Sequence, residues 1–234
     1  MATKVLAVLA LVIGAIGMTA LVGYVAFKGM WVAPRPETAE GAGPYLVDIG
    51  WLVLFALQHS GMARRSCKRW MPVKLERSIY VAASGVVTLV QPLIFQPLPG
   101  ASLWEGQHYL LVVSSLGCFG IGYCWGSFDG VADFLGLREA GFGPAAPNAE
   151  TLHMDRLYRL VRHPLMVTTL MVLWGQPTMP PELLLLNSGL TAYVLIAIRL
   201  EERDLVRQFG QAYVDYRRRV PALVPWRLGR WRGS

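Results

Sequence analysis

Charged residues are scarce in this chain. Only 16% of its 234 residues are Asp, Glu, Lys or Arg, whereas 54% belong to the apolar set, and the mean hydropathy is +0.40. Soluble domains carry about 25% charged residues, because charge keeps their surfaces hydrated. The composition therefore excludes an ordinary soluble protein and indicates an all-α, polytopic integral membrane protein.

Cysteine is also rare, and its spacing matches no metal motif. Cys67, Cys118 and Cys124 are an odd number without a C-x-x-C pair, so we expect neither a disulfide framework nor a metal site. The first apolar run lacks a small-residue cleavage site and is expected to be a retained helix. Because basic residues lie between the apolar runs, the net charge of +7 favours membrane lipids over nucleic acid as partners.

Six apolar runs, each near the about 17–25 residues that a membrane span requires, predict six transmembrane helices. The last two runs are separated only by residues 177–181, which include three prolines. Because proline interrupts a helix, they should form a tight helical hairpin. If this hairpin is re-entrant or broken, the number of spans is five. The runs cover residues 5–27, 45–63, 78–97, 107–127, 164–179 and 182–200.

Lys and Arg are distributed unevenly between the two ends of these helices. If the helices alternate in direction, 20 of the 22 basic residues fall on one side, and only Lys28 and Arg35 fall on the other. The positive-inside rule then places both termini in the cytoplasm, which suits a bacterial inner-membrane protein. Small residues recur at a spacing of four at Ala10 and Gly14 and again at Gly122, Gly126 and Gly130, where we expect helices to approach closely.

Four polar groups should meet at the cytoplasmic end of the hairpin. Arg162 and His163 precede its first arm, and Glu201 and Glu202 follow its second arm. A hairpin returns its two ends to one face, so these residues should converge. They are either a plain boundary ion pair or a functional site. The segment after Glu202 should be a cytoplasmic amphipathic tail, with its apolar side formed by Leu205, Phe209, Tyr213 and Tyr216.

The last third of the chain resembles the isoprenylcysteine carboxyl methyltransferase superfamily, whose members are integral-membrane enzymes that use S-adenosyl-L-methionine. The matching blocks are L-Y-R-L-V-R-H-P (157–164), L-E-E-R-D-L (200–205), F-G-Q-A-Y (209–213) and Y-R-R-R-V-P (216–221). Within the superfamily the chain is most similar to the bacterial methanethiol S-methyltransferases. The blocks for this branch are F-A-L-Q-H-S-G-M-A-R (55–64), E-R-S-I-Y (76–80), F-L-G-L-R-E (134–139) and W-G-Q-P-T-M (174–179).

This resemblance implies S-adenosyl-L-methionine-dependent methylation of a small thiol, methanethiol to dimethyl sulfide, without an obligate protein partner. Residues 1–127 would form N-terminal transmembrane helices, and residues 128–234 the cofactor-binding catalytic region. Met166 stands where the family often has Tyr, which argues against the branch that methylates prenylcysteine carboxylates. The implied cofactor-binding residues are Leu157, Tyr158, Arg162, His163, Pro164, Glu201 and Glu202.

The implied reaction also needs a thiolate, because the thiolate is the nucleophile. His59 and His163 are the candidate bases, and Arg162 would take the cofactor carboxylate. His59 lies near the cytoplasmic end of the second run, where a polar side chain is costly; a helix-to-helix hydrogen bond is its alternative role. Two other functions stay open: methylation of another lipophilic thiol or carboxylate, and a non-catalytic role in membrane assembly.

Overall fold

A computed structural model of the chain is all-helical over the residues that it describes, which are 1–30, 41–127, 137, 140–142 and 156–226. The predicted all-α class is confirmed for this part of the chain. The predicted division after residue 127 falls at a segment outside the described residues.

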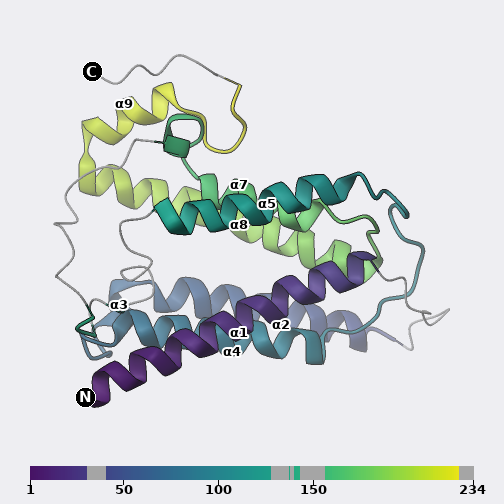
Figure 1. Ribbon diagram of the computed structural model, residues 1–234, viewed down its shortest axis with the longest axis horizontal. Helices are drawn as coiled ribbons and strands as arrows, with labels where there is room; N and C mark the ends of the chain where they lie inside the picture. The colour runs from purple at the N-terminus through teal and green to yellow at the C-terminus, as the bar shows by residue number, and fades with distance from the viewer. Residues whose placement is uncertain (31–40, 128–136, 138–139, 143–155, 227–234) are drawn as a thin grey trace.

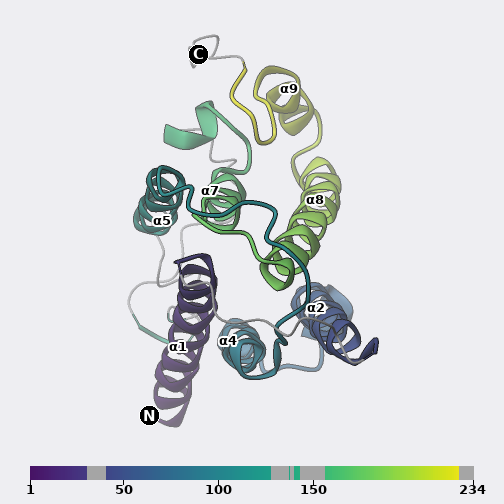
Figure 2. The ribbon, with the colours of Figure 1, turned by 90° about the vertical axis from the view of Figure 1, so that its right-hand side faces the viewer.

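The helices form two layers. Helices α1, α4 and α2 lie in one layer, and α5, α7 and α8 in the other, while α9 folds over the end of α8 (Figure 2). The start of α1 and the ends of α2 and α8 lie at the same end of the bundle, on the left in Figure 1. The elements are α1 (Ala2–Met30), α2 (Gly43–Met62), α3 (Arg65–Lys68), α4 (Glu76–Ile94), α5 (Leu110–Ser127), the 3-10 helix η1 (Arg156–Arg159), α7 (Pro164–Trp174), α8 (Pro181–Phe209) and α9 (Gln211–Arg219).

Three of the described helices, α1, α4 and α8, are long and apolar enough to cross a membrane, and α5 and α7 are shorter apolar helices. Large apolar side chains are exposed on their outer faces, among them Leu9, Ile16, Phe119 and Ile196. An exposed apolar surface of this extent is unfavourable in water and suits hydrocarbon. These helices fit a membrane protein, and the choice between six and five spans stays a prediction.

The predicted hairpin is present, but its arms differ in length from the prediction. Helix α7 ends at Trp174, and its 11 residues rise about 16 Å, roughly half of the hydrocarbon core. Gly175 and Pro177 follow and stop the helix before the apolar run ends. The extended segment pairs with an earlier loop, since Met179 N–H donates to the Trp104 carbonyl at 3.0 Å. Helix α8 continues to Phe209, past the predicted end at residue 200.

Helices α1 and α4 cross in close contact at glycine residues. A Cβ atom on Gly17 would lie 2.0 Å from the Gly85 carbonyl oxygen, and one on Gly85 would lie 2.6 Å from the Cα atom of Gly14. Ala10 is buried at the same contact face. The close approach predicted at Ala10 and Gly14 is confirmed.

The second predicted close approach is wrong at Gly122, since none of the described residues lies within 4 Å of the Cβ position there. Gly130 lies outside the described residues. Helix α5 packs on α7 through Gly117 and Gly120 instead. A Cβ atom on Gly117 would lie 2.7 Å from the Thr168 carbonyl oxygen of α7. The contact therefore uses another face of the same glycine-rich helix.

Candidate active site

The hairpin brings Arg162, His163, Glu201 and Glu202 together. His163 is the residue just before α7, and the two glutamates lie in the C-terminal part of α8. His163 Nε2 lies 3.2 Å from Glu202 Oε1, and His163 Nδ1 lies 3.4 Å from Glu201 Oε2. Arg162 Nε donates to the same Glu202 Oε1 at 2.8 Å. The predicted convergence of these four side chains is confirmed.

The Arg162 guanidinium uses most of its donors inside the protein. Nε and Nη2 donate to Glu202, and Nη1 donates to the carbonyls of Arg217, at 3.1 Å, and of Val220. A guanidinium has five N–H groups, so about four are engaged by described residues. Arg162 thus ties α8 to the end of α9, and its predicted contact with a cofactor carboxylate stays a prediction.

The two glutamates differ in exposure. The side chains of Arg162 and Glu202 are only 9% and 12% exposed, and His163 is buried. The Glu201 side chain is 49% exposed. Glu202 is therefore an internal carboxylate that fixes its neighbours, whereas Glu201 faces solvent and is accessible to a ligand.

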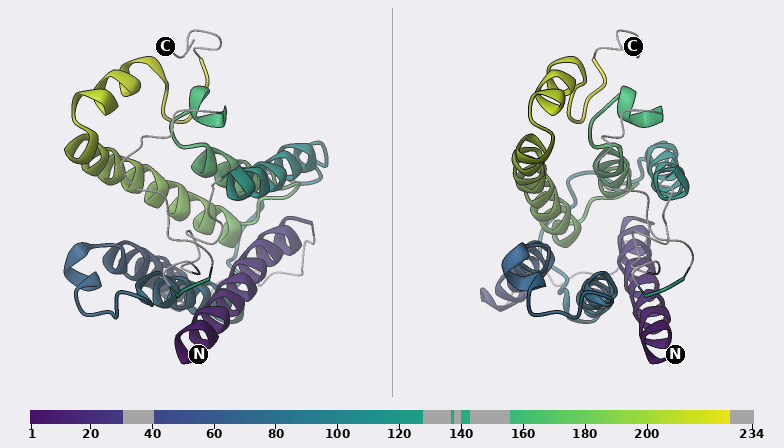
Figure 3. Two further views of the ribbon diagram at one scale, coloured as in Figure 1. Left: turned by 60° about the vertical axis from the view of Figure 1, so that its left-hand side comes forward. Right: turned by 90° about the vertical axis from the view of Figure 1, so that its left-hand side faces the viewer.

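Helix α9 follows α8 and lies near the 3-10 helix η1 at the top of both views in Figure 3. It contacts the cluster through Arg217. Gly210 has φ 57°, in the region that glycine adopts without steric cost, and the chain turns there between α8 and α9. Tyr213 and Tyr216 are buried against Leu205 and Phe209. The predicted apolar side of the tail is confirmed, although it is divided between two helices.

The segment after α9 and the 3-10 helix η1 hold the first arm of the hairpin in place. The backbone N–H groups of Arg162 and His163 donate to the carbonyls of Pro221, at 2.9 Å, and Ala222, at 3.2 Å. The Tyr216 hydroxyl donates to the carbonyl of Tyr158 at 2.7 Å. The remaining predicted cofactor residues lie in the same region, with Leu157 and Tyr158 in η1 and Pro164 at the start of α7.

The tyrosines beside the cluster are protonated at neutral pH. Burial raises the pKa of Tyr213 to about 12, and the negative charge of Glu202 adds to this effect. Burial also raises the pKa of Tyr216. Both phenols are therefore neutral under physiological conditions.

His59 lies in a separate polar cluster, where α2 meets α4 and α8. Its Nε2 lies 2.6 Å from the Tyr80 hydroxyl, and its Nδ1 lies 3.3 Å from the Ser84 hydroxyl. The ring stacks on Phe55, with centroids 5.2 Å apart, and meets the Tyr193 ring edge-on at 5.9 Å. The alternative role predicted for His59, a hydrogen bond between helices, is confirmed by these contacts. Its catalytic role stays a prediction.

The His59 cluster and the cluster around Glu202 contact α8 at different positions along its axis. Tyr193 contacts His59, and Glu201 follows eight residues later, which is about 12 Å along a helix axis. No hydrogen bond or ion pair among the described residues links His59 to the cluster around Glu202. The structure thus places seven of the eight predicted residues near the end of α8 and places His59 beside an earlier turn.

Several contacts of these clusters were not predicted. Tyr80, Ser84 and Tyr193 surround His59, and Arg217 Nη1 lies 3.9 Å from Glu202 Oε2. The spacing of Tyr80 and Ser84, one helical turn apart on an apolar helix, was the available signal for a polar face. Among the described residues, no group of three or more His, Cys, Asp or Glu is placed to hold a metal ion.

The chain is similar to several known proteins. It is 36% identical over 213 residues to Methanethiol S-methyltransferase 2 of Bradyrhizobium diazoefficiens, covering 85% of this chain and 82% of that protein. It is 34% identical over 219 residues to Methanethiol S-methyltransferase of Mycobacterium tuberculosis, covering 87% and 89%. Nurim of Sus scrofa is 35% identical over 182 residues, covering 69% and 68%. No family model and no solved structure matches. At this identity over most of its length, the chain belongs to the methanethiol S-methyltransferase family, within the isoprenylcysteine methyltransferase-like superfamily.

Proposed function

We propose that this protein is a membrane enzyme that methylates methanethiol to dimethyl sulfide with S-adenosyl-L-methionine as the donor. The observation that carries the proposal is the cluster of His163, Glu201 and Glu202, which occupies the positions of the superfamily's motif in a chain of this family. The exposed edge of the cluster is the proposed cofactor site.

The side chains at this site fit the chemistry of S-adenosyl-L-methionine, which carries positive charge, hydroxyls and a carboxylate. Glu201 is half exposed and offers its carboxylate to a cation or to hydroxyl donors. Arg162 would offer a carboxylate the one N–H that its hydrogen bonds to Glu202, Arg217 and Val220 leave among the described residues, and Leu157 and Tyr158 would form the adjoining wall. When bound, the donor would supply an electrophilic methyl carbon on a sulfonium.

His163 and Glu202 would act by positioning. His163 is held between the two glutamates, with contacts of 3.4 Å and 3.2 Å to their oxygens. Glu202 is held in turn by Arg162. This chain of contacts fixes the orientation of Glu201 before a ligand arrives, and preorganised groups of this kind lower the cost of aligning reactants.

His59 would remove the thiol proton. A free thiol with a pKa near about 8.5 is mostly protonated at neutral pH, so a base is needed close to the sulfur. The Nε2 atom of His59 bonds to the Tyr80 hydroxyl, and the proton can reach the imidazole directly or through that hydroxyl. His163 is the second candidate for this role.

The orientation proposed for the membrane agrees with these assignments. The ends of α2 and α8 and the start of α1 share one end of the bundle (Figure 1), and 20 of the 22 basic residues of the chain belong to that predicted side. We assign this end to the cytoplasm of a bacterium and the helices to its inner membrane. A polar cofactor would then enter from the cytoplasm, and an apolar thiol from the bilayer.

A series of alanine variants tests the proposal. His163→Ala and Glu201→Ala should abolish transfer of labelled methyl groups to methanethiol, with normal membrane insertion. His59→Ala should lower kcat while cofactor binding, measured by calorimetry, is retained. Arg203→Ala is the matched control, because Arg203 is adjacent to the pair and exposed. Full activity of both His163→Ala and Glu201→Ala would contradict the site.

A non-catalytic assembly role is the second candidate, because Nurim, whose name states no reaction, also matches most of the chain. Another lipophilic thiol or carboxylate is the remaining enzymatic alternative. Purified protein that is folded but binds no S-adenosyl-L-methionine would favour the assembly role. Cofactor binding without activity on methanethiol would favour another acceptor.

A further inference from the structure

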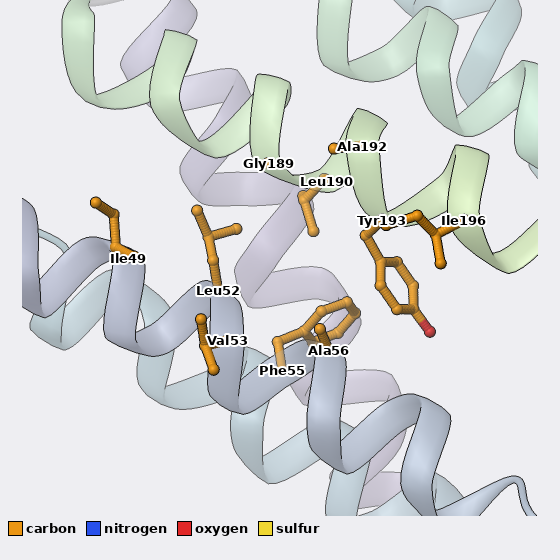
Figure 4. A pocket seen from close by; sticks show the side chains of 10 residues that line it. All are labelled: Ile49, Leu52, Val53, Phe55, Ala56, Gly189, Leu190, Ala192, Tyr193 and Ile196. Carbon is orange, nitrogen blue, oxygen red and sulfur yellow. The ribbon is translucent and has the colours of Figure 1, made fainter.

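An apolar pocket of about 210 Å³ lies between α2 and α8. Figure 4 shows the side chains of α2 and α8 that face each other across it. Among the described residues that line the pocket, Tyr193 alone has a polar side chain. The pocket therefore suits a hydrocarbon group.

The pocket opens on the outer face of the helix bundle. Ile49, Val53 and Ile196 line it and are exposed, on the side where α2 and α8 present apolar side chains to the surroundings. In a bilayer this mouth would face lipid, so an apolar molecule could enter without crossing a polar layer.

The inner end of the pocket adjoins the His59 cluster. The rings of Phe55 and Tyr193 meet edge-to-face with centroids 5.5 Å apart, and both residues line the pocket. Each of the two rings also contacts the His59 imidazole, at 5.2 Å and 5.9 Å. A molecule seated in the pocket would thus lie with one end beside the proposed base.

We propose that this pocket binds the hydrocarbon chain of longer thiols, so that the protein also methylates linear alkanethiols of about three to six carbons. The proposal rests on the proposed thiol methylation. Methanethiol has only two heavy atoms, whereas 210 Å³ is several times the roughly 30 Å³ of one water-sized group. The surplus space matches several methylene groups.

The order of features along α8 agrees with this placement. The pocket residues Gly189 to Ile196 come first, the His59 contact at Tyr193 lies within them, and Glu201 follows. Ile196 and Glu201 are about 8 Å apart along the axis. A chain lying in the pocket with its sulfur toward Tyr193 would direct that sulfur to the end of α8 where the cofactor site is proposed.

The chemistry is the same for every thiol in the series. The thiol gives its proton to His59, which passes it to water. The thiolate sulfur then forms a bond to the methyl carbon, and the bond between that carbon and the donor's sulfonium breaks, with its electron pair remaining on the donor's sulfur. The products are a methyl alkyl sulfide and a neutral thioether, so charge and atoms balance.

A thiol series on the full-length protein in detergent tests the proposal. KM should fall by about three- to fourfold for each added methylene, since each is removed from water in the pocket. Ala192 lines the pocket, so the variant Ala192→Phe, which places a ring there, should raise KM for 1-hexanethiol at least tenfold, with KM for methanethiol within twofold. Leu195→Phe is the control, because Leu195 is also exposed on α8 but is not among the residues that line the pocket.

A binding measurement without cofactor provides a second readout. 1-Hexanethiol alone should raise the Tm of the unaltered protein and of Leu195→Phe, but not that of Ala192→Phe. Activity on methanethiol but not on longer thiols would overturn the inference and leave the proposed function standing. If Ala192→Phe did not change KM for any thiol, and a phospholipid co-purified with the unaltered protein but not with Ala192→Phe, the pocket would be assigned to a lipid chain instead. Inactivity on every thiol would overturn both proposals.

Discussion

Glu202 accepts hydrogen bonds from Arg162, which lies 40 residues earlier in the chain. The same carboxylate oxygen lies 3.2 Å from His163 Nε2, so one atom joins the two arms of the hairpin to the histidine of the motif. The pair is largely buried, and Arg162 also holds the carbonyl of Val220 after α9. The integrity of the site therefore depends on this contact more than on any exposed charge.

Glu202→Gln should destabilise the protein strongly. The variant leaves the Arg162 side chain, 9% exposed, without its counter-charge, and breaking a buried pair costs about 3–5 kcal/mol. Thermal unfolding in detergent should show a much lower Tm for Glu202→Gln than for Glu201→Gln, since Glu201 is half exposed. Equal Tm values for the two variants would contradict the internal role of Glu202.

Gly17→Ala should separate α1 from α4. A Cβ atom there would lie 2.0 Å from the Gly85 carbonyl oxygen, and backbone cannot yield as a side chain can, so we expect a loss of about 1–3 kcal/mol. Gly23→Ala on the same helix is the matched control, because nothing lies within 4 Å of its Cβ position. The measurement is the denaturation midpoint of both variants in detergent, and a neutral Gly17→Ala would argue against the crossing.

Lys28 and Glu182 lock α1 to the start of α8 at the opposite end of the bundle. Lys28 Nζ lies 3.2 Å from Glu182 Oε1, and the side chains are 14% and 2% exposed. Lys28→Met alone should destabilise the protein by about 3–5 kcal/mol because it strands a buried carboxylate, and the double variant Lys28→Met/Glu182→Leu should recover most of that loss. A double-mutant cycle on unfolding in detergent measures this; additive effects would show that the pair is not coupled.

Stability should fall with alkaline pH partly through Tyr213. Its folded-state pKa is raised from 10.0 to about 12, so the unfolded chain loses this proton first. The contribution is fully present below pH about 10 and is lost as pH rises to about 12. Tyr213→Phe should show a shallower decrease in Tm between these pH values, and an unchanged slope would contradict the burial of the phenol.

The convergence of the C-terminal residues could be predicted because it follows from connectivity. A hairpin marked by prolines must return its ends to one face, so Arg162 and Glu202 meet whatever the details of packing. The use of most of the Arg162 donors inside the protein could not be predicted in the same way. It depends on the path of the chain after α9. Every residue has a backbone carbonyl, so the pattern of side chains does not show that the carbonyl of Val220 accepts a hydrogen bond from Arg162.

The sequence-based predictions that were wrong have physical causes as well. Spacing of small residues shows that a helix can approach another, but not which of its faces does so, and α5 uses Gly117 where Gly122 was expected. Hydropathy continued through residues 175–179, although Gly175 and Pro177 end α7 at Trp174. The environment of His59 depends on α4 and α8 together, and only the tertiary structure brings Tyr80 and Tyr193 to it.

The most direct test is to incubate the detergent-purified protein with S-adenosyl-L-methionine and methanethiol and to measure dimethyl sulfide in the headspace. The account predicts dimethyl sulfide that requires both the cofactor and intact His163 and Glu201. Folded protein that produces none, and that binds no S-adenosyl-L-methionine by calorimetry, would contradict the proposed methyl transfer.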